Sequence, residues 1–277
     1  MDDETPSMDV TLWATLDEQA VVPRGELVVQ WFRTALDRLV PAEGSVDSHG
    51  LATESIGGGR EVRVQDVRAD WPVFAEALRP LPFYASAGFH VPAEDEGVWI
   101  DDVARVGAVQ VDRGSRTELS AALRAGERID DPGFCAGLVD FLAMALDAAD
   151  PAFVRVDHLN FHESTDLEAA LSRSRRKSRR ESRSLLRGYS WVTGVPGELA
   201  ARLGGARALR ATGAFHAVRE LRGGGLLLQA CETLAGYDAH RVRAVFHALA
   251  PVLPPGMPVT DPARPGMRVV FEDARAY

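Results

Sequence analysis

The fold prediction starts from residues 188–205, which read GYSWVTGVPGELAARLGG. Residues 189–195 are rich in aromatic and β-branched side chains, a composition typical of a β-strand. Pro196 favours the start of a helix directly after this strand, and the pair Gly204-Gly205 favours its end. The stretch therefore predicts a strand that leads at once into a short helix.

The residues that follow extend this pattern to a full β-α-β-β-α-β order. Two apolar runs lie on either side of the Arg-Gly-Gly-Gly sequence at 222–225, which predicts a hairpin. Asp238 is a favourable N-cap for a helix whose apolar residues recur at helical spacing. Residues 268–271, Arg-Val-Val-Phe, predict a final strand. Residues 188–277 are therefore predicted to form a ferredoxin-like domain.

The first 163 residues predict a similar order of strand, helix, hairpin, further elements, helix and strand. Residues 114–131 are polar and favour neither helix nor strand. We infer an α+β protein whose two ferredoxin-like halves arose as a pseudo-duplication, although the sequence itself does not repeat. The expected N-terminal elements are a strand at 10–16, a helix from Pro23 to Pro41, a hairpin over 45–68, a short helix at 71–78, strands at 83–91 and 103–111, a helix capped by Asp131, and a strand at 153–159.

Charge is distributed unevenly along the chain, whose net charge is −9. Residues 1–171 hold 13 Arg and 32 Asp or Glu, whereas residues 172–187 hold eight basic residues and one acid. An Arg-rich segment without an apolar face predicts a solvated basic helix or a flexible connector. The alternative is docking on the acidic half through weak, screened ion pairs. The predicted domains are an acidic α+β domain at 1–163, an Arg-rich helical connector at 164–187 and the ferredoxin-like domain at 188–277.

Composition also excludes several classes of protein. No apolar run is long enough to span a bilayer, and the acidic start Met1-Asp2-Asp3-Glu4 lacks the features of a signal peptide. Cys135 and Cys231 have no metal-binding or redox spacing. We therefore expect a cytoplasmic protein without a cofactor. The acidic half disfavours nucleic acid and favours a partner with a basic surface.

One cluster, residues 157–163, contains residue types that bind metals or catalyse reactions. If the strand continues through it, His158 and His162 lie about 13 Å apart, which is too far to share one ion. The glycine runs at 57–59 and 223–225 lead into strands, whereas a phosphate loop needs a helix directly after it. We therefore expect neither a metal site nor an enzyme.

A protein-binding surface is predicted between the two strands of 83–91 and 103–111. Here a tryptophan is flanked by carboxylates, a combination suited to an apolar anchor with a charged rim. A solvated loop is the alternative. The predicted contact residues are Glu94, Asp95, Glu96, Trp99, Asp101 and Asp102.

Residues 186–205, together with Gly213-Ala214-Phe215-His216, Tyr237-Asp238 and residues 253–256, resemble a known group of proteins. The similar group is the actinobacterial immunity-type proteins of polymorphic-toxin systems, including those related to the type VI immunity group. The resemblance covers about 70–90 residues at the C-terminus. It implies a non-enzymatic protein that binds a cognate toxin domain in the cytoplasm and blocks its active site. A toxin that cuts nucleic acid tends to be basic, which agrees with an acidic inhibitor.

Two other hypotheses remain open at this point. The chain could be an enzyme or a small-molecule-binding protein with a pocket between two ferredoxin-like halves, lined by His158, Asn160 and His162. It could also be a structural protein that self-associates through the edges of its sheets.

Overall fold

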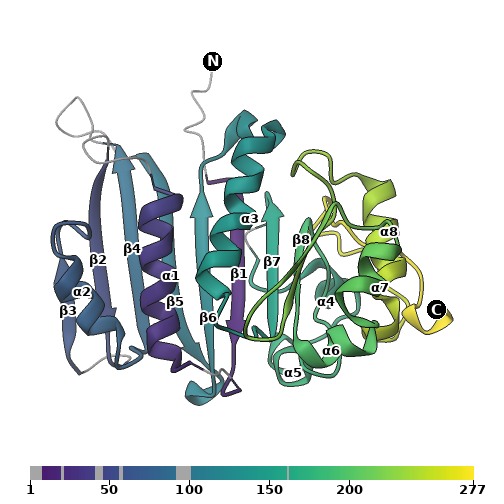
Figure 1. Cartoon of the computed structure of the whole chain (residues 1–277), viewed down its shortest axis with the longest axis horizontal. Helices are drawn as coiled ribbons and strands as arrows, with labels where there is room; N and C mark the ends of the chain where they lie inside the picture. The colour runs from purple at the N-terminus through teal and green to yellow at the C-terminus, as the bar shows by residue number, and fades with distance from the viewer. Residues whose placement is uncertain (1–7, 20–21, 41–45, 56–58, 92–100, 161) are drawn as a thin grey trace.

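The computed structural model describes residues 8–19, 22–40, 46–55, 59–91, 101–160 and 162–277. Within these ranges, ten strands form one antiparallel sheet in the order β3-β2-β4-β5-β6-β1-β7-β8-β10-β9 (Figure 1). The strands are β1 (Val10–Leu16), β2 (Asp47–Thr53), β3 (Glu61–Val64), β4 (Tyr84–Val91), β5 (Asp101–Val111), β6 (Arg116–Leu123), β7 (Phe153–His158), β8 (Val192–Val195), β9 (Ala217–Glu220) and β10 (Leu226–Gln229).

Two long helices lie side by side across one face of this sheet (Figure 1). They are α1 (Arg24–Arg38) and α3 (Pro132–Leu146), and the rings of Trp31 and Phe141 meet between them with centroids 4.7 Å apart. The shorter helices are α2 (Trp71–Leu78), α4 (Asp166–Ala170), α5 (Arg175–Glu181), α6 (Gly197–Arg202), α7 (Gly205–Ala211) and α8 (Ala239–Leu249).

The central strand β1 separates two different environments. Because side chains alternate along a strand, Leu12 and Leu16 lie on the face covered by the long helices, whereas Thr11 and Thr15 lie on the opposite face. β1 pairs with β6 on one side and with β7 on the other. On β6, Thr117 accepts a hydrogen bond from Arg24 of α1, so its neighbour Glu118 lies on the face away from α1.

The predicted α+β class is confirmed, but the structure does not establish two ferredoxin-like halves. A single sheet runs through both parts of the chain, because Val154 and Val156 of β7 pair with Gly194 and Val192 of β8. The strand expected over residues 268–271 is wrong. Val269 and Val270 are both buried, without the alternation of a strand, and the N–H of Val270 donates to the Tyr189 hydroxyl at 2.9 Å.

Two elements in the structure are absent from the sequence-based prediction. Residues 116–123, within the stretch that favoured neither helix nor strand, form β6 at the centre of the sheet. The Gly-Gly pair ends α6 as expected, but a second helix, α7, follows at once. Gly204 allows this change of direction because its φ of 81° is a left-handed conformation that glycine adopts readily.

The basic segment is packed into the structure, so the expectation of a solvated helix or flexible connector is wrong. Residues 172–187 include α5, whose Arg176, Lys177 and Arg180 are exposed, but Arg179 and Arg187 are buried. Residues 163 and 188, the predicted domain boundaries, lie between β7 and β8, which are hydrogen-bonded neighbours. The division into three domains at these boundaries stays a prediction. Across the described ranges, no helix is both long enough and apolar enough to cross a membrane.

Candidate functional site

A cavity of about 350 Å³ opens where β7 and β8 separate. The two strands pair only over residues 154–156 and 192–194. Beyond this point the Ser190 hydroxyl replaces the missing ladder, since its Oγ accepts from the N–H of Val156 at 3.2 Å and donates to the carbonyl of Val192 at 2.6 Å. Leu234, Tyr237 and residues 263–268 supply further parts of the wall. The cavity, referred to below as the β7 pocket, therefore joins segments that are far apart in the sequence.

His158, Asn160 and His162 all line the β7 pocket. The strand ends at His158 and does not continue to His162, because Leu159 has a φ of 56° and turns the chain. Asn160 is held in place by two hydrogen bonds: its amide donates to Asp166 at 3.0 Å, and its carbonyl oxygen accepts from the N–H of His162 at 3.1 Å. Within the described part of the chain, no group of three or more His, Cys, Asp or Glu residues has the geometry to hold a metal ion.

Asp157 is the most strongly perturbed carboxylate of the β7 pocket. Burial raises its pKa from the usual 3.8 to about 6, although the neighbouring Arg155 charge acts in the opposite direction. The two side chains form an ion pair, with 3.0 Å between Arg155 Nη1 and Asp157 Oδ2. The geometry does not make a hydrogen bond, and Oδ2 has no hydrogen-bond partner among the described residues. Burial also lowers the pKa of His158.

Two further polar groups of the β7 pocket were not predicted from the sequence. Tyr237 is only 3% exposed, and its hydroxyl has no hydrogen-bond partner among the described residues. The guanidinium of Arg268 lies 5.7 Å from the centre of the Tyr237 ring. Tyr237 lies between β10 and α8, and Arg268 follows α8, so no local motif connects them with residues 157–162. Only the paired sheet brings them together.

Most of the predicted protein-binding segment lies outside the described residues. This applies to Glu94, Asp95, Glu96 and Trp99, whereas Asp101 is the first residue of β5. Asp102 is paired with Arg105, with 2.6 Å between the carboxylate and the guanidinium, and its side chain is 31% exposed. Asp102 also lies opposite His90 of β4. The segment therefore connects the ends of β4 and β5.

The strands β2, β4 and β5 also present exposed side chains on one face of the sheet. His49 of β2, Tyr84 of β4 and Arg105 of β5 are exposed, and they alternate with buried residues that face the helices. The rings of His49 and His90 lie 5.7 Å apart. We refer to His49, Tyr84, His90 and Arg105 as the open sheet face.

The acidic half of the chain binds the basic segment through buried ion pairs. Arg179 pairs with Asp112 and Glu118, at 3.1 and 3.3 Å, and Arg183 pairs with Asp17 at 2.8 Å. The predicted alternative, in which the basic segment docks on the acidic half, therefore has the correct location. The ion pairs are buried, however, and solvent does not screen them. Burial alone would raise the pKa of Asp17, yet the hydrogen bonds and charge of Arg183 outweigh it and hold that pKa below its usual value.

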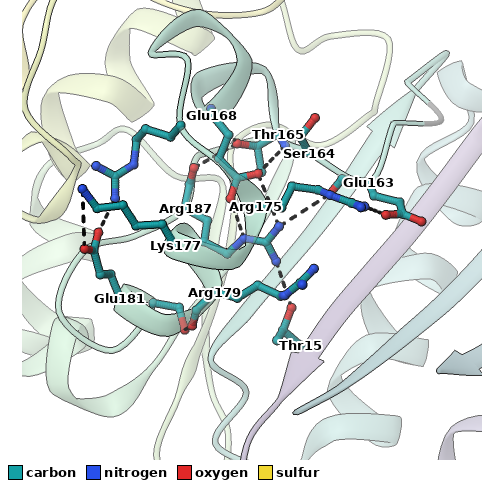
Figure 2. Close-up of polar contacts among 12 residues, drawn as sticks. Thr15, Glu163, Ser164, Thr165, Glu168, Arg175, Lys177, Arg179, Glu181 and Arg187 are labelled. Carbon is teal, nitrogen blue, oxygen red and sulfur yellow. Dashed lines mark hydrogen bonds and ion pairs between the residues drawn. The ribbon is translucent and has the colours of Figure 1, made fainter. Parts of the chain in front are cut away.

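Arg187 is the most enclosed member of this group. Figure 2 shows its guanidinium between Glu168 and Thr15, with Nε at 2.8 Å from Glu168 Oε1 and Nη1 at 3.1 Å from Thr15 Oγ1. Glu168 also belongs to the capping box of α4, in which Thr165 Oγ1 accepts from the N–H of Glu168. Arg187 therefore ties the start of α4 to the central strand β1.

No family model matches the sequence, and no curated protein matches it. The chain shares its fold with a solved T6SS protein. This is the Pseudomonas aeruginosa T6SS protein PA0821, which is 14% identical in sequence and superimposes with a TM-score of 0.54. The similarity covers 97% of this chain and 80% of that protein. At this identity the likeness is one of fold, and it includes the N-terminal half as well as the segment that carried the sequence resemblance.

Replacing Asp157 with asparagine is expected to change how stability depends on pH. A carboxyl group whose pKa is raised to about 6 in the folded state destabilises the fold as pH rises from about 4 through 6, because the folded protein must then release a proton that it binds more tightly. Relative to Asp157→Asn, the wild type should lose about 1–3 kcal/mol of unfolding free energy between pH 4 and pH 7.

The measurement is urea unfolding of both proteins at four pH values in this range. Asp140→Asn, on an exposed part of α3, is the control, and its difference from the wild type should change by less than about 0.5 kcal/mol. A constant difference between Asp157→Asn and the wild type at all four values would contradict the prediction.

Proposed function

We propose that this chain is a non-enzymatic immunity protein, which binds a cognate toxin domain in the cytoplasm of the producing cell and blocks its active site. The observation that carries the proposal is the likeness in fold to a T6SS protein over 97% of the chain. The resemblance of residues 186–205 to immunity-type proteins supports it independently, because it comes from sequence and not from shape.

The net charge favours a basic partner. With a charge of −9, the chain attracts a basic domain and repels nucleic acid. Such complementarity increases the association rate, an advantage for a protein that must capture a toxin before it acts. Arg179, Arg183 and Arg187 each pair with a carboxylate within the fold. These internal ion pairs therefore leave the net negative charge of the chain unchanged.

The proposed contact surface combines the acidic segment with the open sheet face. The segment that carries Glu94, Glu96 and Trp99 joins the strands that present Tyr84 and Arg105. Tryptophan, tyrosine and arginine are the residues that most often dominate the energy of protein interfaces. The carboxylates of the acidic segment would pair with the lysines and arginines of a basic toxin.

The test is protection from the products of neighbouring genes. Each neighbouring product is expressed with and without this chain, and growth of the host and capture on an affinity column are measured. We expect one product to be toxic alone, harmless in the presence of this chain, and retained with it on the column. If the chain neither protects against any neighbouring product nor binds one, the proposal is wrong.

Matched variants then test the contact surface. The triple variant Glu94→Gln, Glu96→Gln, Asp102→Asn should bind the toxin at least tenfold more weakly, with most of the loss in the association rate at low salt. The control removes the same charge at exposed positions elsewhere, in Glu18→Gln, Glu127→Gln, Glu232→Gln. Equal losses in the two variants would show that net charge alone, and not this surface, determines binding.

A further inference from the structure

The β7 pocket is lined by three polar side chains, those of Asp157, Tyr237 and Arg268, that form no ion pair or hydrogen bond with one another in the described structure. We propose that it binds a small zwitterion of the α-amino-acid class, with the ligand carboxylate on Arg268 and Tyr237 and the ligand ammonium on Asp157. The inference is independent of toxin binding, since it rests on the pocket of the isolated chain. Its three elements are a cation, a buried hydroxyl and a carboxylate that face one cavity.

Arg268 is the available cation of the β7 pocket. The other arginine in its wall, Arg264, is engaged, because its Nη2 donates to Ser164 Oγ at 2.6 Å and its Nη1 to the Ser164 carbonyl at 3.3 Å. The guanidinium of Arg268, in contrast, forms no ion pair or hydrogen bond within the described part of the chain and lies over the ring of Tyr237. A planar guanidinium with free N–H groups suits a carboxylate, which it can bind in a bidentate manner.

The Tyr237 hydroxyl reinforces the preference for an anionic group. It is buried and unpartnered among the described residues, whereas buried hydroxyl groups in folded proteins normally have a hydrogen-bond partner. Burial raises the pKa of Tyr237 well above its usual value, so the hydroxyl keeps its proton and can donate it to an acceptor. A ligand carboxylate in this place would accept from Tyr237 and from Arg268 together.

Asp157 supplies the opposite end of the site. Its Oδ2 lacks a hydrogen bond among the described residues, although Arg155 lies within ion-pair distance behind it. Asp157 and Arg268 interact electrostatically, but they form no ion pair in the described structure. Their charged atoms therefore lie more than about 4.0 Å apart. A ligand that carries both charges can bridge this gap with its ammonium toward Asp157. The other carboxylate, Asp166, is already engaged by Asn160 and by the N–H of Arg268.

Size and walls restrict the ligand further. The volume of about 350 Å³ lies near the lower end of the range for small-molecule sites, about 300–1,000 Å³. Tyr189, Trp191, Leu234 and Met267 form an apolar part of the wall. An apolar or aromatic amino-acid side chain can lie against these residues while its backbone charges meet the polar groups.

The test measures binding of the twenty L-amino acids to the full chain by thermal shift, followed by calorimetry. L-leucine and L-phenylalanine are expected to bind. The matched compounds that lack one charge, isopentylamine, 4-methylpentanoate, phenethylamine and 3-phenylpropionate, should bind at least tenfold more weakly. A concentration of about 10 mM is far above the dissociation constant expected for a specific site. If no L-amino acid stabilises the protein at this concentration, the proposal is overturned.

Variants locate the bound ligand. Arg268→Met and Asp157→Asn should each weaken binding at least tenfold, and Tyr237→Phe about tenfold, because it removes only the hydroxyl. Arg207→Met, at an exposed position of α7, should bind as tightly as the wild type. Thermal unfolding without ligand verifies that each variant is folded. Binding that survives both Arg268→Met and Tyr237→Phe would also overturn the proposal.

Discussion

Replacing Arg187 with alanine is expected to destabilise the protein by about 3–5 kcal/mol. The side chain is 3% exposed, and its partner Glu168 is fully buried, so the substitution leaves a carboxylate without its counter-charge in a region that water does not reach. The same change removes the hydrogen bond to Thr15 and the contact of the guanidinium with the Phe153 ring, 5.2 Å away. Urea unfolding followed by circular dichroism measures the loss.

Two further variants distinguish the effect of removing a buried charge from that of removing an exposed one. Arg180→Ala removes an exposed arginine from the end of α5 and should change stability by no more than about 0.5 kcal/mol. The double variant Arg187→Met, Glu168→Leu replaces both charges with apolar groups and should be more stable than Arg187→Ala, because no unpaired charge remains. A loss below about 1 kcal/mol in Arg187→Ala would show that the buried pair contributes little to stability.

The second large effect is expected for Trp191→Ala, with a loss of about 3–5 kcal/mol. Trp191 is fully buried at the point where β7 and β8 separate, and its indole N–H donates to the carbonyl of Cys231 at 2.8 Å. Truncation therefore creates a cavity and removes one of the two donors to this carbonyl, which also accepts from Gln229 Nε2 at 3.1 Å. Trp191→Phe fills most of the space but lacks the N–H, and should lose about 1–3 kcal/mol.

Phe271→Ala is the control for this series. It also removes an aromatic ring from the C-terminal part of the chain, but that ring is 48% exposed, and the expected change is within about 0.5 kcal/mol. Equal effects of Trp191→Ala and Trp191→Phe would indicate that the hydrogen bond to Cys231, and not the volume of the ring, accounts for the loss.

Local signals in the sequence were sufficient for most elements. The strand at 10–16 and the helices capped by Asp131 and Asp238 were predicted at their observed positions, and both caps accept the expected backbone hydrogen bonds. These predictions are correct because the periodicity of apolar residues and the chemistry of N-caps act over a few residues. The strand β6 was missed because only Leu119 alternates with polar residues, Glu118 and Ser120, while the apolar run after Ser120 and the charged start obscured the pattern.

The sequence could not show which charges would be buried. Arg179, Arg183 and Arg187 recur every four residues, a spacing that places them on one side of a helical segment, but their partners Asp17, Asp112 and Glu118 are far away in the chain. The sequence of a solvated basic helix therefore cannot be distinguished from that of a buried one without the assembled sheet. The β7 pocket has the same origin, because Asp157, Tyr237 and Arg268 meet only through the pairing of β7, β8 and β10.

The central position of β1 has a consequence for synthesis of the protein on the ribosome. Val10 pairs with Leu123 on one side and with His158 on the other, so neither neighbour exists when β1 emerges. At about 5–20 residues per second, translation needs on the order of ten seconds to supply both partners. During this time the nascent chain exposes VTLWATL, an uncharged segment of high β-propensity and the kind of sequence that chaperones shield from aggregation.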